Sequence, residues 1–423
     1  MGMMRKGLRG DGEYRGSHYR WLMVFAGFLS MVFYYGIVIN CQGQLIEPIA
    51  EEQGYNRVIM SSIFALINGG MVISSPFLAR ISNRFGPEKT LVTCSLVISM
   101  AMIWFSFSRS LLFYYLSALL IGMAFVGVTT LLLPILVNKW FDANNRGFAL
   151  SLAFMGSGIG GLLLNPAFAT IVKGLNWRWA YGLSGVFFLV LFTPFLFLVI
   201  YYLPRRRGYL PSLTDLEDSP LGGSNNLDRG TLDYRIVIGS VCVAAFLIGG
   251  TGASVLLHGT SHLVTLGQTP GEASMVIGLF LGVLAFSKLL VGRSCDKLGC
   301  KKTLIIFLGL ASAGTFSLFL CSFTVLGCIL FIGFFGLGGA AMTVCPPLVV
   351  REIFSNQRYS QELGKVMASI GLGNMGIPLI GGMIYDYTGS YNGFWIFDSV
   401  LLLVAITLFM FGFHKANRSG SPK

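Results

Sequence analysis

Charged residues are scarce in this 423-residue sequence, because Asp, Glu, Lys and Arg together make up only 11% of it. A soluble domain typically carries about 25% charged residues. Hydrophobic residues account for 54% of the chain, and its mean hydropathy is +0.72. The shortage of charge excludes an ordinary soluble protein and predicts that most of the chain lies in lipid.

Patterns typical of metal or nucleotide chemistry are also missing. The eight cysteines show no zinc-type paired spacing, and we interpret those inside apolar runs as small packing residues. The glycine-rich stretches 156–166 and 371–382 contain no Walker lysine, so we interpret them as faces for close helix contact rather than phosphate loops. No apolar run carries paired acids or a nucleophile beside a base. We therefore expect no enzymatic activity, no cofactor and no metal site.

Twelve apolar stretches are long enough to cross a bilayer core, which takes about 20 helical residues. Uninterrupted runs of this length exclude barrel strands, which alternate over about 10 residues. The sequence therefore predicts an all-α membrane protein with 12 transmembrane helices. The predicted spans are 21–45, 59–80, 90–108, 111–137, 147–172, 180–203, 235–263, 272–292, 303–323, 325–350, 364–386 and 392–414.

The basic residues are distributed unevenly around these spans. If the N-terminus is cytoplasmic, all but five of the 30 Lys and Arg fall on the cytoplasmic side. Because this bias is the positive-inside rule, the net charge of +12 indicates topology rather than nucleic-acid binding. We predict a multi-pass protein of the plasma or inner membrane, functional as a monomer, with both termini in the cytoplasm. The five exceptions are Arg57, Arg109, Lys173 and Arg178 on the other side, and Lys288 within a span.

Two similar charged loops indicate an internal repeat. The stretches ARISNRFGPEKTL (79–91) and GRSCDKLGCKKTL (292–304) align at a spacing of 213 residues, as from Lys89 to Lys302. A fixed register over several landmarks predicts one six-helix unit used twice in parallel, which is how alternating-access carriers are built. Further pairs at the same spacing are Gly54 and Gly267, Pro134 and Pro347, and Phe141 and Phe354.

One long polar segment separates the two predicted halves. Residues 204–234 are rich in Pro, Gly, Ser and Asp, which is typical of a linker. The predicted organisation is a cytoplasmic tail 1–20, a six-helix bundle 21–203, a cytoplasmic linker 204–234, a second six-helix bundle 235–414 and a cytoplasmic tail 415–423.

The charged loops resemble the signature loop of the major facilitator superfamily, and the resemblance covers residues 20–414. It implies that each loop helps to close the cytoplasmic side. The first copy departs from the pattern, since Asn83 replaces the usual acid, so we expect a weaker latch there that relies on neutral hydrogen bonds. The matching positions are Asn83, Arg84 and Gly86 in the first copy, and Gly292, Asp296, Lys297, Gly299, Lys301 and Lys302 in the second.

Four further stretches are similar to the monocarboxylate and oxalate–formate branch of that superfamily. This resemblance implies a secondary active transporter, and it says little about which substrate is carried. The stretches are KWFDANNRGFALSLAFMGSGIGG (139–161), NWRWAYG (176–182), HLVTLGQTPGEAS (262–274) and PLIGGMIYDYTGSYNGFW (378–395).

Lys288 is the basic residue placed within a span. A lysine at the centre of a span costs about 2.5–3.5 kcal/mol on insertion scales, so it usually faces a partner or a water-filled cavity. The resemblance implies a substrate-facing basic residue in this part of the eighth helix, commonly Arg. Lys288 is therefore the candidate cation for a substrate carboxylate. The alternative is a lysine that extends to the cytoplasmic interface.

Two other groups of polar residues are candidates. His258 and His262 stand at i and i+4 near the outer end of the seventh span, where they serve either gating and proton coupling or a structural role. A metal site would need a third ligand, and none lies nearby. The first span ends in YYGIVINCQGQLIE, which the resembled fold places beside the cavity, so its polar side chains are substrate-binding candidates. These are Tyr34, Tyr35, Asn40 and Gln44.

The sequence thus favours a secondary active transporter of a small organic anion, monocarboxylate-like, coupled to protons or to a counter-anion. Its partners would be that small-molecule anion and the lipid bilayer, with no nucleic acid. One alternative is a proton-driven exporter of drugs or other amphiphiles, which would not depend on Lys288. Another is a transporter-like sensor, although the short linker and tails argue against one.

Overall fold

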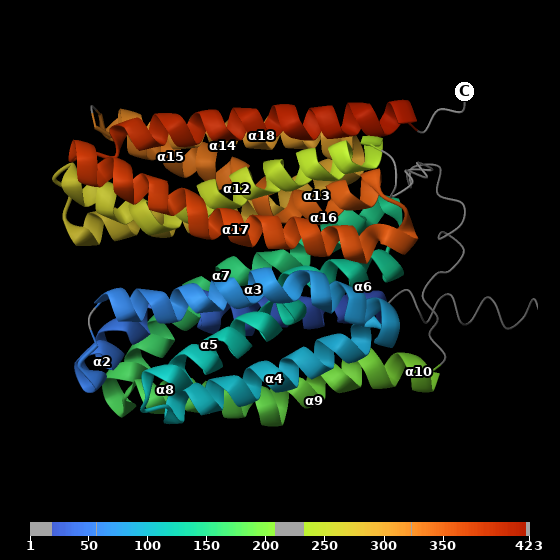
Figure 1. The fold of residues 1–423 in the computed structure, drawn as a ribbon, viewed down its shortest axis with the longest axis horizontal. Helices are drawn as coiled ribbons and strands as arrows, with labels where there is room; N and C mark the ends of the chain where they lie inside the picture. The colour runs from blue at the N-terminus through green and yellow to red at the C-terminus, as the bar shows by residue number, and fades with distance from the viewer. Residues whose placement is uncertain (1–18, 56, 208–231, 323, 420–423) are drawn as a thin grey trace, which may run out of the picture. The chain divides into compact units, whose positions relative to one another are not determined.

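The computed structural model describes residues 19–55, 57–207, 232–322 and 324–419. Among these residues, twelve helices are long and apolar enough to cross a membrane (Figure 1). The predicted all-α architecture with 12 transmembrane helices is therefore confirmed. Residues 1–18 of the predicted tail, 208–231 of the linker and 420–423 lie outside the described residues.

The chain forms two compact units, one of Met1–Gly70 and Phe77–Ser219, the other of Met71–Pro76 and Pro220–Lys423. We call them the N-terminal and C-terminal units. The first span is a helix over 19–30 that continues as the π-helical segment η1. The remaining elements of the N-terminal half are α2 (Gly43–Gln53), α3 (Arg57–Phe85), α4 (Pro87–Phe107), α5 (Leu111–Val126), η2 (Gly127–Leu131), α6 (Leu132–Trp140), α7 (Ala143–Leu175), α8 (Trp177–Phe187), η3 (Phe188–Phe192), α9 (Thr193–Leu196), η4 (Phe197–Tyr202) and α10 (Leu203–Arg207), with η1 at Met31–Asn40.

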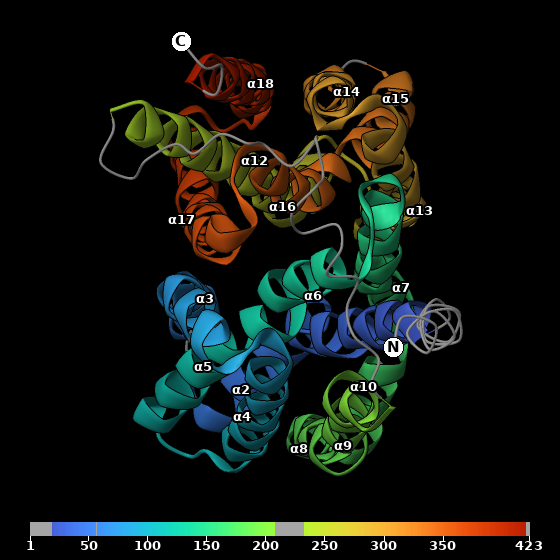
Figure 2. The same cartoon turned by 90° about the vertical axis from the view of Figure 1, so that its right-hand side faces the viewer.

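The C-terminal unit is built from seven helices of the described chain. Within it, α12 packs against α17 and α18, and α14 packs against α15 and α18, as Figure 2 shows. Its elements are α12 (Leu232–Thr265), α13 (Pro270–Leu298), α14 (Cys300–Leu320), α15 (Val325–Gly338), α16 (Ala341–Ile353), α17 (Asn356–Thr388) and α18 (Asn392–Ser419).

The two charged loops have the same backbone geometry. Gly86 and Gly299 have φ of 88° and 83°, a region that L side chains rarely adopt, and each begins the next helix. Thr90 and Thr303, also 213 residues apart, donate their hydroxyls to the carbonyls of these glycines at 2.8 and 2.9 Å. The repeat predicted from the sequence is therefore present in the hydrogen bonds of the loops as well.

Glycines of the two glycine-rich stretches allow helices to touch through their backbones. A Cβ on Gly160 of α7 would lie 2.3 Å from the Val32 carbonyl oxygen, and a Cβ on Gly373 of α17 would lie 1.9 Å from that of Phe246. Both distances are far below van der Waals contact. The interpretation of these stretches as faces for close helix contact is therefore confirmed.

The NWRWAYG turn holds the outer end of the N-terminal unit together. Arg178 donates through Nε to Glu52 Oε1 at 2.7 Å and through Nη1 to the carbonyls of Ser106 and Ser108 at 2.6 and 2.8 Å. Trp177 donates its indole N–H to the other oxygen of Glu52 at 2.6 Å. One side chain therefore joins α2, α8 and the last carbonyls of α4.

Replacing Arg178 with alanine is expected to destabilise the protein by about 2–3 kcal/mol, because hydrogen bonds to charged groups contribute roughly 1.5–3 kcal/mol. Arg205→Ala is the matched control: this arginine is exposed and lies 3.9 Å from the centre of the Tyr201 ring, a contact worth about 0.5–1 kcal/mol. Thermal unfolding of the purified variants in detergent measures both. Equal losses in the two variants would contradict a specific role for Arg178.

The turn before α13 carries a capping box. Thr269 Oγ1 accepts a hydrogen bond from the Glu272 backbone N–H, and the Glu272 carboxylate accepts from the Thr269 backbone N–H at 2.9 Å. These hydrogen bonds lower the pKa of Glu272. The cap is therefore present above the ordinary pKa of a glutamate and is lost as the pH falls through the lowered value.

Candidate functional site

Tyr34 is fully buried inside the N-terminal unit. Its hydroxyl shares a hydrogen bond of 2.7 Å with Ser95 of α4, which shares one of 2.5 Å with Thr193 of α9. Its ring lies 4.4 Å from the Phe188 ring, centre to centre. These contacts fasten η1 to α4, η3 and α9, so the structure gives this tyrosine a packing role within its own unit.

The other first-span candidates are less enclosed. Tyr35 is half-buried and packs its ring 5.6 Å from that of Phe125. Asn40 donates from Nδ2 to the Ser157 carbonyl at 2.9 Å, against α7. Gln44 is half-buried in the first turn of α2. The π-helical turn η1 ends at Asn40, and π-helical turns are frequent at functional sites.

Lys288 lies on the buried side of α13. Its side chain is 3% exposed, whereas Phe286 and Leu290, about 200° away around the helix, are 66% and 55% exposed. Leu298, the last residue of α13, is ten residues further on, or about 15 Å along the axis. In this conformation the ammonium is neither on the outer face of the helix nor in solvent, which disfavours a lysine extended to the interface.

The two histidines share one face of α12 and both bind backbone carbonyls. His258 Nε2 lies 2.8 Å from the Pro378 carbonyl oxygen, and His262 Nε2 lies 2.9 Å from that of Leu318. Since a carbonyl can only accept, each Nε2 carries the hydrogen and each neutral ring leaves Nδ1 as an acceptor. Both rings also contact the ring of Tyr391.

The structure separates Lys288 from the histidine pair. Helices α12 and α13 are consecutive and joined by a short turn, and His262 is three residues before the end of α12. Lys288 is 18 residues beyond the start of α13, so the two lie about 20 Å apart along the helix axes. An anion site at Lys288 and a gate at the histidines are therefore different places in the C-terminal unit.

The charged residues of the signature loops are largely exposed. Glu88, which stands where the signature pattern usually has a basic residue, forms a salt bridge of 3.2 Å with Lys139 at the end of α6. This acid also lies in the first turn of α4, where the helix dipole favours negative charge. The exposed loop residues are Asn83, Arg84, Lys297, Lys301 and Lys302, while Gly86, Asp296 and Gly299 are partly buried and Gly292 is buried.

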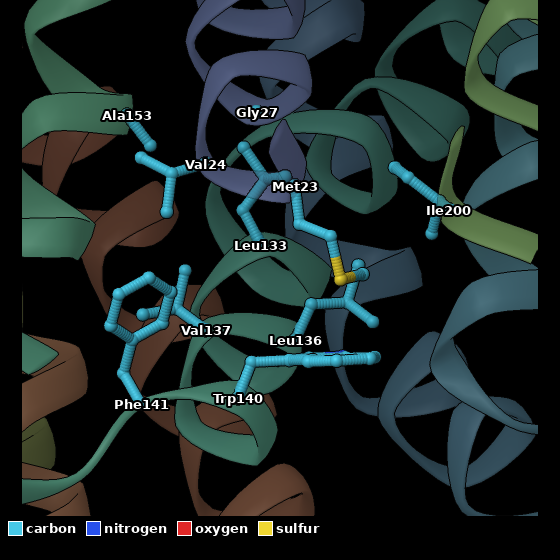
Figure 3. Close-up of a pocket in the computed structure, with 10 residues that line it drawn as sticks. All are labelled: Met23, Val24, Gly27, Leu133, Leu136, Val137, Trp140, Phe141, Ala153 and Ile200. Atoms are coloured by element: carbon cyan, nitrogen blue, oxygen red, sulfur yellow. The ribbon is translucent and has the colours of Figure 1, made fainter. Parts of the chain in front are cut away.

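An apolar pocket lies inside the N-terminal unit, between the first span and α6 (Figure 3). Figure 3 shows its side chains as hydrocarbon apart from the Met23 sulfur and the Trp140 indole nitrogen. None of the candidate binding residues lines it, so this pocket is not the predicted anion site. The lining residues are Met23, Val24, Gly27, Leu133, Leu136, Val137, Trp140, Phe141, Ala153 and Ile200.

Sequence reasoning missed the polar contacts that join distant helices. Asp398 of α18 is fully buried, and Thr251 of α12 donates to its Oδ1 at 2.9 Å. Two thiol pairs, Cys295 with Cys345 and Cys321 with Cys328, also come together, with sulfur–sulfur distances of 3.9 and 3.4 Å. Spacing in the sequence gives no signal for such pairs when 50 to 147 residues separate the partners, as for Cys295 and Asp398.

Comparison with known proteins connects this geometry to a family. The model of the Major Facilitator Superfamily matches residues 23–325 and 260–423. Monocarboxylate transporter 13 of Rattus norvegicus is 25% identical over 409 residues, covering 92% of this chain and 88% of the relative. Monocarboxylate transporter 11 of Mus musculus is 24% identical over 400 residues, covering 92% of this chain and 86% of its own.

Solved structures share the fold. The human organic anion transporter MFSD10 aligns with a TM-score of 0.69 at 15% identity, over 93% of this chain and 99% of its own. The proton:xylose symporter XylE aligns with a TM-score of 0.70 at 18% identity, over 94% of this chain and 95% of its own. At these identities the likeness shows the fold alone.

Proposed function

We propose that this chain, which belongs to the Major Facilitator Superfamily, carries a small organic anion of the monocarboxylate class across the membrane. The observation that carries the proposal is the buried ammonium of Lys288, 3% exposed in the middle of an apolar helix. A cation in this position is costly in lipid and is retained where it serves a polar pathway. A carboxylate is the simplest substrate group that would pair with it.

The relatives support the same substrate class. The transporters of rat and mouse that match most of this chain are named for monocarboxylates, and one solved structure of the same fold is an organic anion transporter. Membership of the superfamily makes the chain a membrane transporter, not an enzyme. The choice of a monocarboxylate rests on Lys288 together with these names.

The remaining candidate residues take secondary roles in this proposal. Asn40, Gln44 and Tyr35 would orient the substrate from the N-terminal unit, while Tyr34 is committed to its hydrogen bonds with Ser95 and serves packing. His258 and His262 would respond to protons or to movement near the outer end of α12. The mechanism would be alternating access of the two six-helix units, coupled to protons or to a counter-anion, in a monomer of the plasma or inner membrane with cytoplasmic termini.

A panel of ligands tests the proposal directly. Short monocarboxylates are expected to raise the thermal unfolding temperature of the purified protein, because a ligand at 100 times its Kd stabilises the folded state by about 2.7 kcal/mol. The matching amides and alcohols, which lack the negative charge, should leave the temperature unchanged. Stabilisation by uncharged amphiphiles alone would contradict the proposal and favour an exporter of such compounds.

A further inference from the structure

Cys321 and Cys328 lie together where α14 ends and α15 begins. The Cys328 thiol donates to the Cys321 sulfur at 3.4 Å, and the Cys321 thiol donates to the Ser317 carbonyl at 3.3 Å. Gln268, in the turn between α12 and α13, donates its side-chain N–H to the Cys328 sulfur at 3.5 Å. A continuous chain of contacts therefore fixes both sulfurs in position.

The surroundings of the pair connect two helical hairpins. Cys328 packs in a small apolar cluster with Leu263 of α12 and Ala273 of α13, and Cys321 packs against the same cluster. His262, next to Leu263, binds the Leu318 carbonyl one turn before Cys321. The pair thus lies where the α12–α13 turn meets the α14–α15 turn, at the end of α14 opposite the signature loop.

We propose that Cys321 and Cys328 form a disulfide that closes the α14–α15 turn in the mature protein. The proposal is independent of the transported substrate, and it rests on the proposed topology only for the compartment in which the oxidant lies. A disulfide needs the two sulfurs to approach from 3.4 Å to about 2.05 Å. Rotation of the two side chains about χ1 provides such a movement without displacing a transmembrane helix.

The chemistry requires an oxidant, which is a protein or small-molecule disulfide in the compartment that the turn faces. Cys321 is the more exposed thiol, so its thiolate attacks the oxidant and forms a mixed disulfide. The Cys328 thiolate then displaces the oxidant's second sulfur. The two cysteines lose two electrons and two protons, and the oxidant's disulfide leaves as two thiols.

A second thiol pair in the same unit provides an internal control. Cys295 of α13 and Cys345 of α16 have sulfurs 3.9 Å apart, near the signature loop at the other end of α14. The positive-inside rule places this end in the cytoplasm, where glutathione keeps thiols reduced. Opposite redox states are therefore expected for the two pairs, one oxidised and the other reduced.

The test traps thiols in intact cells and uses no transport assay, so its failure is distinct from failure of the proposed function. Cells producing the full chain are treated with N-ethylmaleimide, and the protein is digested and mapped by mass spectrometry with and without reductant. The expected result is a linked peptide pair containing Cys321 and Cys328, with Cys295 and Cys345 alkylated. Alkylation of both Cys321 and Cys328 overturns the proposal.

Purified protein gives a second readout. Reduction with dithiothreitol is expected to lower the thermal unfolding temperature by about 3–6 °C, as for a disulfide that closes a short loop. Diamide should restore it, oxidising the two thiols while it is itself reduced to the hydrazine. Cys328→Ser should show neither change, and Cys345→Ser should behave as wild type. A wild-type temperature that ignores both reagents overturns the proposal.

Discussion

Replacing Lys288 with glutamine is expected to lower carboxylate transport by about 100-fold or more. Truncating one partner of a buried charge pair costs roughly 2–5 kcal/mol, and each 1.4 kcal/mol corresponds to about a factor of ten. Glutamine keeps the length of the stem and a hydrogen-bond donor, so the variant removes the charge with little change in packing. Uptake of a labelled monocarboxylate into liposomes that contain the purified variant measures the effect.

Two further variants separate charge from structure at this position. Lys288→Arg keeps the cation and is expected to retain a substantial fraction of transport. Lys415→Gln removes a lysine of the same unit that pairs with Asp233 at 2.8 Å while partly exposed, a contact worth about 0–1 kcal/mol, and should transport normally. Full activity of Lys288→Gln would remove the anion-binding role, and equal loss in the Arg variant would indicate a packing defect instead.

The parts of the fold that local sequence controls could be predicted well. A span announces itself by about 20 consecutive apolar residues, and the repeat announces itself where one backbone geometry demands one residue type. Gly86 and Gly299 must be glycine-like because their φ is positive, and this requirement kept the two loops recognisable. At the position equivalent to Gly389, by contrast, Asn176 adopts a φ of 95°, so the match was invisible in the letters.

The candidate site was less predictable because its contacts join helices far apart in the sequence. Tyr34 reads as a polar side chain in a cavity-lining span, but its partner Ser95 is 61 residues away and lies in the same unit. The departure at Glu88 reads as a weakened loop, yet Lys139, 51 residues on, pairs with it. Periodicity shows which face of a helix is polar, and only the packing of the helices shows which neighbour that face meets.

Gly373 tests that packing most severely, and Gly373→Ala is expected to destabilise the C-terminal unit by roughly 3 kcal/mol or more, at the upper end of overpacking costs. The new Cβ would lie 1.9 Å from the Phe246 carbonyl oxygen and 3.0 Å from the Gly250 nitrogen, both backbone atoms of α12. Because no side chain can move aside to relieve this contact, α12 and α17 must separate, and the tight pairing between them is lost. Thermal unfolding in detergent, together with the yield of folded protein, measures the loss.

The same helix supplies the control, and the repeat supplies an independent copy of the test. Gly382→Ala, also in α17, meets nothing within 4 Å and should be neutral or stabilising by about 0.5–1 kcal/mol, since glycine weakens a helix interior. Gly160, 213 residues before Gly373, approaches the Val32 carbonyl in the same way, so Gly160→Ala should destabilise the N-terminal unit comparably. If Gly373→Ala and Gly382→Ala unfolded at the same temperature, the small-residue contact would not hold α12 against α17. A loss in Gly373→Ala without one in Gly160→Ala would mean that the two copies of the repeat no longer share this way of joining their helices.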